Sequence, residues 1–264
     1  MRFFLDNGFL EYETVGTGIP VLFIHGFPLS RKMWSPQLIS LSKIASLISI
    51  DLRGHGDSYP FDGPYSMELL ADDCVKLMKF LNVLSPFVVC GLSMGGYVIM
   101  AMYRKYPEFF RGMILTSTRP EPDPPEGKKV RDESIRNAQV SGTRRIVNTM
   151  LPNLFSSVTQ TKNPHLSKQI QIMMTKTSVQ GIIGALQGIR DRPDSLLLLN
   201  QISCPVLIVH GTDDKIVPMN EAELMERKIS NSRLVKINDA GHLPNLEQPD
   251  KYNQAIRDFL RSLS

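Results

Sequence analysis

The stretch that most constrains the fold is FVVCGLSMGG, at residues 87–96. Four apolar residues that favour β-structure lead into a G-x-S-x-G pattern centred on Ser93, and a helical pattern follows over residues 97–106. A turn this sharp between a strand and a helix forces the serine into a strained backbone conformation, and side chains two positions to either side would collide. Because Gly91 and Gly95 carry no side chain, the pattern predicts that Ser93 stands clear of the backbone.

The rest of the chain alternates between predicted strands and helices. Short runs rich in apolar and β-branched residues predict strands at 9–15, 21–24, 47–50, 112–116, 205–210 and 234–237. Helical patterns follow several of them, including one that opens at Ser66 and carries an apolar stripe. The alternation predicts an α/β fold, with a mostly parallel central sheet and helices on both of its faces.

The alternation breaks at Arg119, where a proline-rich segment begins. Between residues 127 and 190 the sequence shows only helical patterns, at about 128–139, 142–150, 165–175 and 179–190. Helices inserted in this way are expected to cover the edge of the sheet formed by the carboxyl ends of its strands. We therefore expect a core domain of residues 1–118 and 193–264, and a helical cap of residues 119–192.

A neutral serine hydroxyl is a poor nucleophile, so Ser93 needs a base to take its proton and an acid to orient that base. Among five histidines, only His242 follows the last predicted strand, in a Gly-His loop. It is the expected base, and the alternative is a loop histidine that merely caps the next helix. A base must be neutral, so activity is expected to rise through about pH 6 to 7, where an ordinary histidine loses its proton.

The acid is expected to be Asp213 or Asp214, because both directly follow a predicted strand and precede His242. The remaining aspartate would hold the turn by bonding to its own backbone.

The anion that forms when a serine attacks a carbonyl needs two N–H donors. The helix behind Ser93 leaves its first amides unpaired, and Met94 carries the nearest of them. At the HGFP corner Pro28 has no amide hydrogen, which leaves Gly26 and Phe27, and of these we favour Phe27. A simple turn is the alternative for that corner.

Two further features are candidates for a site. Trp34, the only tryptophan, is expected either to pack in the core or to lie near the HGFP corner and contact substrate. The Gly-rich loop at residues 51–58 carries Arg53, His55 and Asp57 but has no metal-ligand spacing. We interpret it as a structural loop held by internal ion pairs.

Composition argues against several other classes of protein. The 30 basic and 26 acidic residues give a net charge of +4 that is spread along the chain, so no nucleic-acid partner is expected. Three cysteines without C-x-x-C spacing indicate neither a disulfide framework nor a zinc site, and no metal or cofactor is expected. With no signal-peptide pattern and no apolar run of about 18 residues, we expect a cytoplasmic protein that does not interact with membranes.

Five segments resemble the α/β-hydrolase fold superfamily, in particular small bacterial carboxylesterases and enol-lactone hydrolases with a four-helix cap. They are HGFP at 25–28, DLRGHGDS at 51–58, GLSMGG at 91–96, GTDDKIVP at 211–218 and AGHLPNLEQP at 240–249, in the family's order along nearly the whole chain. The resemblance implies a cap inserted after the sixth strand. It also implies that the acid is Asp214 and that the two amide donors belong to Phe27 and Met94.

The function that this resemblance implies is that of a cofactor-free serine carboxylesterase acting on small to medium carboxylic esters. Ser93, His242 and Asp214 would form its catalytic triad. A lactonase, a carbon-carbon bond hydrolase and a perhydrolase would use the same triad, and a slow-turnover ligand receptor is an alternative of another class. Enol-lactone hydrolases are expected to hold an acidic substrate, and Arg119 is a candidate cation for it.

Overall fold

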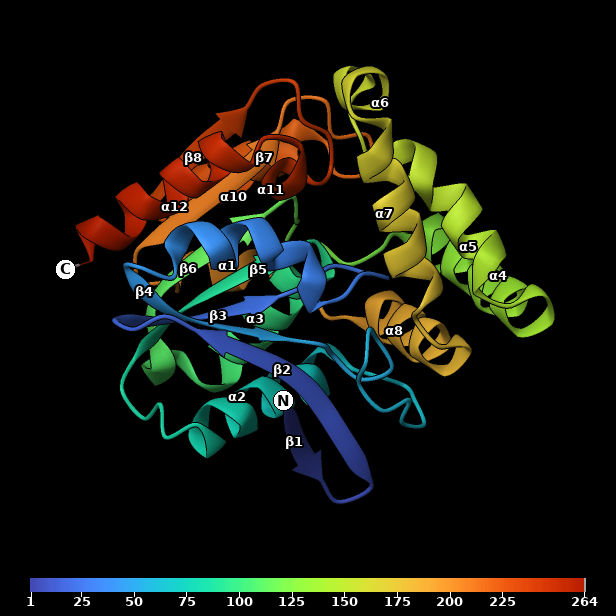
Figure 1. Ribbon diagram of the computed structural model, residues 1–264, viewed down its shortest axis with the longest axis horizontal. Coiled ribbons are helices and arrows are strands. Elements are labelled where there is room, and N and C mark those ends of the chain that lie inside the picture. The colour runs from blue at the N-terminus through green and yellow to red at the C-terminus, as the bar shows by residue number, and fades with distance from the viewer. Residues whose placement is uncertain (264) are drawn as a thin grey trace.

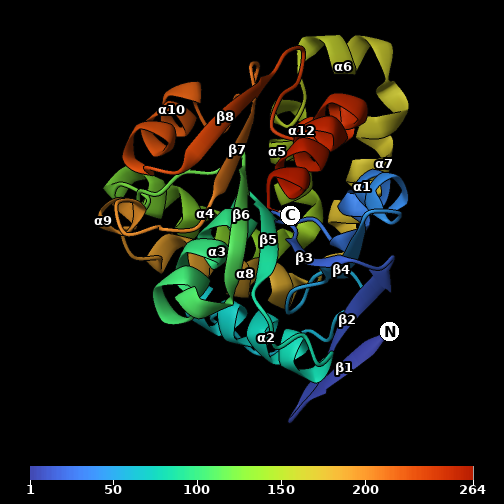
Figure 2. The ribbon, with the colours of Figure 1, turned by 90° about the vertical axis from the view of Figure 1, so that its left-hand side faces the viewer.

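The computed structural model describes residues 1–263, and in this part of the chain the strands form one eight-stranded sheet (Figure 1). They are β1 (Arg2–Leu5), β2 (Gly8–Val15), β3 (Ile19–Ile24), β4 (Ala45–Ile50), β5 (Phe87–Leu92), β6 (Phe110–Thr116), β7 (Val206–Gly211) and β8 (Ser232–Ile237). Their order in the sheet is β1-β2-β4-β3-β5-β6-β7-β8, and Figure 2 shows this succession from β1 at the lower right to β8 at the upper left. The pairs β1–β2 and β2–β4 are antiparallel and the other pairs are parallel, which confirms the predicted mostly parallel sheet.

Helices cover both faces of the sheet. On one face lie α1 (Ser35–Leu41), α11 (Pro244–Glu247) and α12 (Pro249–Ser262), and on the other lie α2 (Met67–Phe80), α3 (Met94–Lys105) and α10 (Met219–Lys228). Shorter elements are η1 (Arg31–Trp34), η2 (Pro107–Phe109) and α9 (Leu196–Leu199). Within β3, Leu22 and Ile24 pack in one hydrophobic core while Val21 and Phe23 pack in the other, because successive side chains of a strand point to opposite faces.

The segment between β6 and β7 is helical, as predicted. It contains α4 (Pro125–Ser141), α5 (Thr143–Met150), η3 (Leu151–Asn153), α6 (Ser157–Lys162), α7 (Pro164–Thr175) and α8 (Val179–Asp191). Figure 1 shows α4 to α8 together beyond one edge of the sheet. The four predicted helices are present, but α6 is a fifth, started by the Ser156 hydroxyl, which accepts a 3.1 Å hydrogen bond from the Thr159 amide. The division into a core of 1–118 and 193–264 and a cap of 119–192 stays a prediction.

Helix α8 packs on the loop that follows β4 with backbone against backbone. The Gly54 carbonyl accepts hydrogen bonds from both the amide (3.2 Å) and the hydroxyl (3.1 Å) of Ser178, just before α8. Further along, the Tyr65 amide donates to the Gly184 carbonyl at 2.9 Å. A Cβ atom placed on Gly188 would lie only 1.7 Å from the Tyr65 carbonyl oxygen. The glycines of α8 are therefore required for this close approach, which fixes the helix on the core.

None of the helices in residues 1–263 combines the length and the apolar character that crossing a membrane would require.

We expect Gly188→Ala to lower the free energy of unfolding by about 1–3 kcal/mol, because the added methyl group overlaps the Tyr65 carbonyl and forces the backbone apart. Urea unfolding followed by circular dichroism measures the change. The control is Gln187→Ala, at the preceding and partly exposed position of the same helix, which should change stability by less than about 1 kcal/mol. Equal effects of the two substitutions would contradict the account of α8 packing.

Candidate active site

The predicted site residues meet at the edge of the sheet where the parallel strands end. Ser93 follows β5, Asp214 follows β7, His242 follows β8 and Phe27 follows β3. A pocket of about 70 Å³ lies at this edge, and Phe27, Ser93, Met94 and His242 all line it. Asp214 lies behind it, in contact with the histidine. The fold therefore brings together residues that are far apart in the sequence.

The turn at Ser93 has the geometry that the sequence predicts. Ser93 has a φ of 55°, a conformation that non-glycine residues rarely adopt. A Cβ on Gly91 would lie 2.5 Å from the carbonyl carbon of Gly95, and a Cβ on Gly95 would lie 2.3 Å from the Ile24 carbonyl oxygen. The Ser93 amide donates a 2.9 Å hydrogen bond to the Thr116 carbonyl in β6. Strand β6 therefore holds the strained residue in place.

Asp214 and His242 are joined by a hydrogen bond. The Nδ1 atom of His242 lies 2.8 Å from Oδ2 of Asp214, and both side chains are buried. The other carboxylate oxygen of Asp214 accepts the amides of Ile216 at 2.8 Å and Val217 at 3.0 Å. With both oxygens occupied, rotation of the carboxylate is restrained, so it fixes the orientation of the imidazole and leaves Nε2 outside this hydrogen bond.

The charge on Asp214 is stabilised by its partners. Burial alone would raise the pKa of Asp214, but the charge and hydrogen bond of His242 and the Val217 amide outweigh it and hold this pKa below its usual range. A second histidine, His210, lies 3.7 Å from the carboxylate and bonds through Nε2 to the Val217 carbonyl at 2.9 Å. Burial lowers the pKa of His210, so it is neutral at pH 7 and donates to that carbonyl. Asp214, rather than Asp213, is therefore the aspartate in contact with His242.

Ser93 and His242 line the same pocket, but within residues 1–263 no hydrogen bond joins the serine hydroxyl to the imidazole. In enzymes without substrate such bonds are often long and tighten when substrate binds. The shared pocket, rather than a completed bond, is what brings these two side chains together.

Trp34 does not line the pocket. Its side chain is fully buried and packs against Phe23, with ring centroids 5.1 Å apart, and against Tyr252 at 6.3 Å. These contacts place it in the hydrophobic core under α1 and α12. Of the two roles considered for Trp34, these contacts are those of core packing, and the expected substrate contact has no counterpart among the residues that line the pocket.

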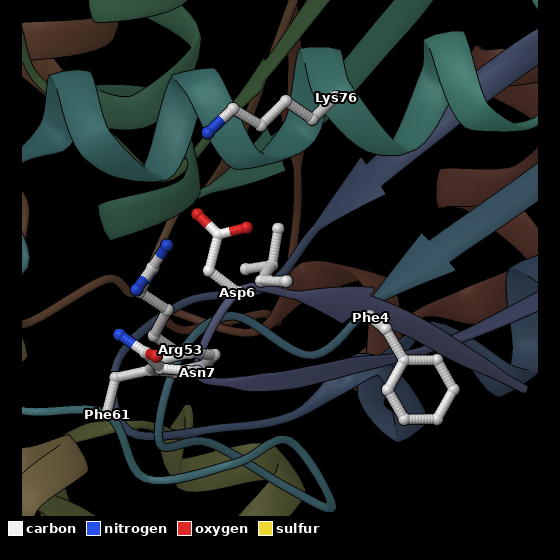
Figure 3. Close-up of a pocket in the computed structure, with 7 residues that line it drawn as sticks. Phe4, Asp6, Asn7, Arg53, Phe61 and Lys76 are labelled. Atoms are coloured by element: carbon white, nitrogen blue, oxygen red, sulfur yellow. The ribbon is translucent and has the colours of Figure 1, made fainter.

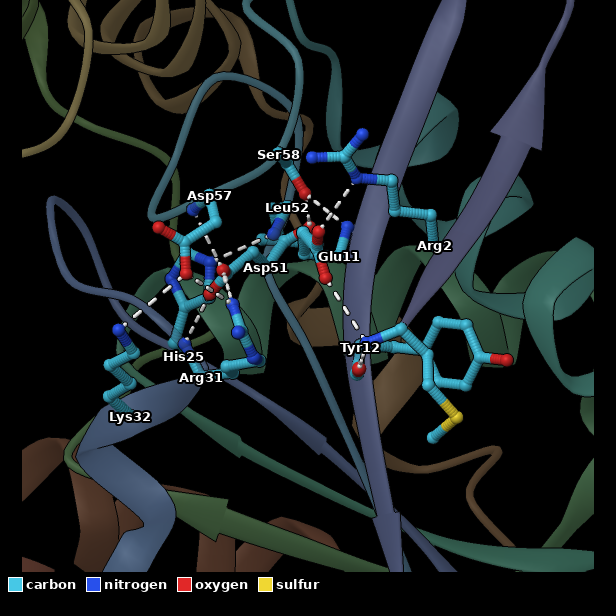
Figure 4. A network of polar contacts seen from close by, with 11 residues as sticks. Arg2, Glu11, Tyr12, His25, Arg31, Lys32, Asp51, Leu52, Asp57 and Ser58 are labelled. Atoms are coloured by element: carbon cyan, nitrogen blue, oxygen red, sulfur yellow. Dashed lines mark hydrogen bonds and ion pairs between the residues drawn. The ribbon is translucent and has the colours of Figure 1, made fainter.

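The loop at residues 51–58 is held by ion pairs, but the ion-pair partners come from outside the loop and are not internal to it as expected (Figure 4). Asp51 is bound by the guanidinium and the amide of Arg31, and its carboxylate also accepts the Asp57 amide at 2.9 Å. Arg53 pairs with Asp73 of α2 through two hydrogen bonds, one of 2.5 Å and one of 2.9 Å. These contacts have a structural role and none of the five residues lines the pocket.

The rest of the pocket wall comes from residues that the sequence does not single out together. Besides Phe27, Ser93, Met94 and His242, the lining residues are Tyr97, Arg119, Arg131, Met150, Ile189, Ile216 and Val217. Ile216 and Val217 lie in the GTDDKIVP segment and could have been found there. Arg131, Met150 and Ile189 come from three separate helices, α4, α5 and α8, and no local pattern connects them.

Three arginines converge on the buried carboxylate of Asp123, next to the pocket. Its oxygens accept hydrogen bonds from Arg119 at 2.7 Å and from Arg131 and Arg192 at 2.9 Å each. Burial alone would raise the pKa of Asp123, but the charges and hydrogen bonds of Arg131 and Arg192 outweigh it and lower the pKa to about 2. The guanidinium carbon of Arg192 also lies 4.2 Å from the centroid of the Tyr97 ring. Of these three arginines, Arg119 and Arg131 also line the pocket.

Glu121 and Glu221 lie near this arginine group and reduce its positive charge. Burial and the neighbouring Glu121 raise the pKa of Glu221 to about 7, so around neutral pH the Glu221 carboxylate carries only part of a negative charge. Arg119 acts in the opposite direction and favours the charged form of Glu221.

A larger hollow of about 280 Å³ lies elsewhere, at the turn between β1 and β2 (Figure 3). Phe4, Asp6, Arg53, Phe61 and Lys76 are among its lining residues. Arg53 is already paired with Asp73, and among residues 1–263 no serine, cysteine or histidine lines this hollow. The smaller pocket at Ser93 is therefore the better candidate for chemistry.

A family model, curated proteins and solved structures that resemble this chain all indicate the same family. A family model described as "alpha/beta hydrolase fold" matches residues 19–249. The AB hydrolase superfamily protein YisY of Bacillus subtilis is 30% identical over 262 residues, 96% of each chain. The 3-oxoadipate enol-lactonase 1 of Acinetobacter baylyi is 26% identical and covers 92% of this chain and 89% of its own. Among solved structures, an esterase from Thermogutta terrifontis with malate bound is 40% identical, with a TM-score of 0.97 over 100% of this chain and 99% of that one.

We expect Asp123→Asn to lower the free energy of unfolding at neutral pH, because three guanidinium groups lose their shared carboxylate. The pKa of Asp123 lies below its value in an unfolded chain. Its ion pairs therefore stabilise the fold above about pH 4, and this stabilisation is lost as the pH falls towards 2. The difference between wild type and variant should narrow by about 2 kcal/mol over that range, as measured by urea unfolding at several pH values.

The control for this substitution is Asp132→Asn, whose carboxylate is 41% exposed and pairs with Arg190. An exposed pair contributes less than about 1 kcal/mol, so its pH dependence should be small. If the two variants respond equally to pH, the arginine group around Asp123 does not stabilise the fold in the way described.

Proposed function

The chain belongs to the α/β-hydrolase fold family, and we propose that it is a serine carboxylesterase that cleaves small to medium carboxylic esters. The observation that carries this proposal is the hydrogen bond between His242 and Asp214, beside a pocket that Ser93 also lines. A serine at a strained turn, a fixed imidazole and a buried carboxylate are the three parts needed for acyl transfer. The similar proteins, which include an esterase and an enol-lactonase, support a hydrolase.

In the proposed mechanism, the Ser93 hydroxyl attacks the acyl carbon while Nε2 of His242 takes its proton. Asp214 stabilises the imidazolium through Nδ1. The negative charge on the former carbonyl oxygen is bound by two backbone amides, that of Phe27 after β3 and that of Met94 at the N-terminus of α3. The bond to the alcohol then breaks, and His242 returns the proton to the leaving oxygen.

The acyl group now bound to Ser93 is released by water. His242 takes a proton from the water as its oxygen attacks the acyl carbon, and the same two amides bind the second oxyanion. When the ester bond to Ser93 breaks, the proton passes from His242 to the serine oxygen. The products are the acid and the alcohol, and each step uses only the chain's own groups and water.

The size of the pocket supports a preference for short acyl groups. At about 70 Å³ it is far below the roughly 300–1,000 Å³ typical of sites for drug-sized ligands. Met150 and Ile189 close it from the helical segment, while Ile216 closes it from the loop after β7. We also propose that residues 119–192 act as a cap that limits the length of the substrate.

We expect Ser93→Ala to leave the fold unchanged and to lower kcat by at least about 10³-fold, because the nucleophile is removed. A series of p-nitrophenyl esters of increasing acyl length, assayed beside several lactones, measures both activity and chain-length preference. Wild type should prefer acetate and butyrate over longer esters.

Near-wild-type hydrolysis of p-nitrophenyl acetate by Ser93→Ala would contradict the proposed mechanism. Wild-type turnover below about one event per minute on every ester, with melting temperatures that rise in the presence of a ligand, would instead favour the receptor function.

A second candidate function is hydrolysis of lactones or esters that carry a carboxylate. Arg119 and Arg131 both line the pocket, which places a positive group close to Ser93. Two of the similar proteins point in the same direction, since one is a 3-oxoadipate enol-lactonase and the other was solved with malate, a dicarboxylate. Arg119 is thus proposed as a cation for an acidic substrate.

If this second candidate is correct, we expect Arg119→Gln to reduce the preference for p-nitrophenyl hydrogen succinate over p-nitrophenyl butyrate about tenfold or more. A charge-assisted hydrogen bond to the substrate carboxylate would be lost, whereas the neutral ester of similar size would be unaffected. The control is Lys129→Gln, which removes one positive charge from the exposed surface of α4, where the side chain is 70% exposed. If both variants change kcat/KM equally, no specific carboxylate contact exists.

A further inference from the structure

We propose that Glu247 is a positioning residue that fixes the loop carrying His242 and joins this loop to the segment Leu154–Ser156 of the inserted helices. The inference rests on the proposed function, since it assigns a role to a residue that acts through His242. Glu247 ends the short helix α11, which begins two residues after the histidine.

One oxygen of Glu247 holds the histidine loop. Its Oε1 atom accepts the backbone amide of Gly241 at 2.8 Å and that of Leu243 at 3.3 Å, so the residues on both sides of His242 donate to the same atom. Within residues 1–263 Glu247 forms no ion pair, and every hydrogen bond to its carboxylate comes from a backbone amide. A carboxylate used in this way restrains the backbone and does not compensate a cationic side chain.

The other oxygen of Glu247 holds the helical segment. Its Oε2 atom accepts the Ser156 amide at 2.8 Å. Two further hydrogen bonds connect the same parts of the chain. The His242 amide donates to the Leu154 carbonyl at 2.9 Å, and the Ser156 hydroxyl donates to the Asp239 carbonyl at 2.9 Å. Glu247 therefore lies between the two segments and bonds to both.

The contact between these segments is close enough to transmit a displacement. A Cβ atom placed on Gly241 would lie 2.8 Å from the carbonyl carbon of Phe155 and 2.8 Å from the Ser156 nitrogen. With so little space, the two backbones must move together. His242 must keep its bond to Asp214 while Nε2 faces Ser93, and a shift of about 1 Å in such a group can cost about 100-fold in rate.

The first experiment compares Glu247→Gln and Glu247→Ala with wild type on p-nitrophenyl butyrate. In Glu247→Gln an amide nitrogen replaces one acceptor oxygen and faces an N–H group, so the hydrogen bonds to one of the two segments are lost. In Glu247→Ala the hydrogen bonds to both segments are lost. We expect kcat to fall about 10-fold and about 100-fold respectively. KM should change less than about threefold, because the pocket residues are unaltered.

The matched control is Glu226→Gln. The Oε1 atom of Glu226 also accepts a backbone amide, that of Leu234 at 2.9 Å, but it lies away from the pocket. Its kcat should stay within about twofold of wild type, even if its melting temperature falls. If kcat of both Glu247 variants also stays near wild type in protein that unfolds cooperatively, Glu247 does not position His242.

The second experiment measures backbone hydrogen exchange by mass spectrometry, which needs no substrate. In Glu247→Ala we expect faster exchange in two peptides, one covering residues 239–243 and one covering residues 154–158. Glu226→Gln should leave both unchanged. Faster exchange confined to the histidine loop would overturn the connection to Leu154–Ser156.

These readouts separate the inference from the proposed function. If wild type cleaves no ester, the proposed function fails, while the exchange experiment still tests whether Glu247 joins the two segments. If wild type is an active esterase and the exchange rates do not change, the inference fails alone.

Discussion

The packing of the turn at Ser93 against β3 is the constraint on which the rest of the site depends. A side chain at Gly95 would overlap the Ile24 carbonyl, so the turn and the end of β3 are in direct backbone contact. This contact fixes the start of α3 next to the loop that leads from the end of β3 to Phe27. The serine and both proposed amide donors are thus located by backbone geometry, which side-chain motion alters little.

The positions of His242 and Asp214 depend on hydrogen bonds, since both residues lie in loops. Asp214 is held by two amides of its own loop, and His242 by its bond to Asp214 and by the amides around Glu247. Each of these carboxylates is satisfied by N–H donors, which compensates the free energy lost when a charge is removed from water. Polar networks of this kind allow a loop to be as well defined as the strands beside it.

Local patterns predicted the parts of the fold that local chemistry determines. The central strands and the Ser93 turn follow from apolar runs and paired glycines. Strand β1 was not predicted because its four residues pair only with β2, and α6 is too short to show a helical period. No single stretch of the sequence determines the contacts between segments that are distant along the chain. For that reason the sequence could not decide between core and substrate contact for Trp34, nor group Arg131 with Met150 around the pocket.

The backbone contacts of α8 have a consequence for how selectivity can change. Helix α8 is packed on the Gly54–Tyr65 region, and Leu154–Ser156 is bonded to the His242 loop, so the inserted helical segment is attached to the rest of the chain at two separated points. A segment attached at two points cannot swing as a rigid body about one hinge. Access to Ser93 then depends on the shapes and rotamers of side chains such as Met150. Single substitutions at such positions would change the shape of the pocket without disturbing the sheet beneath it.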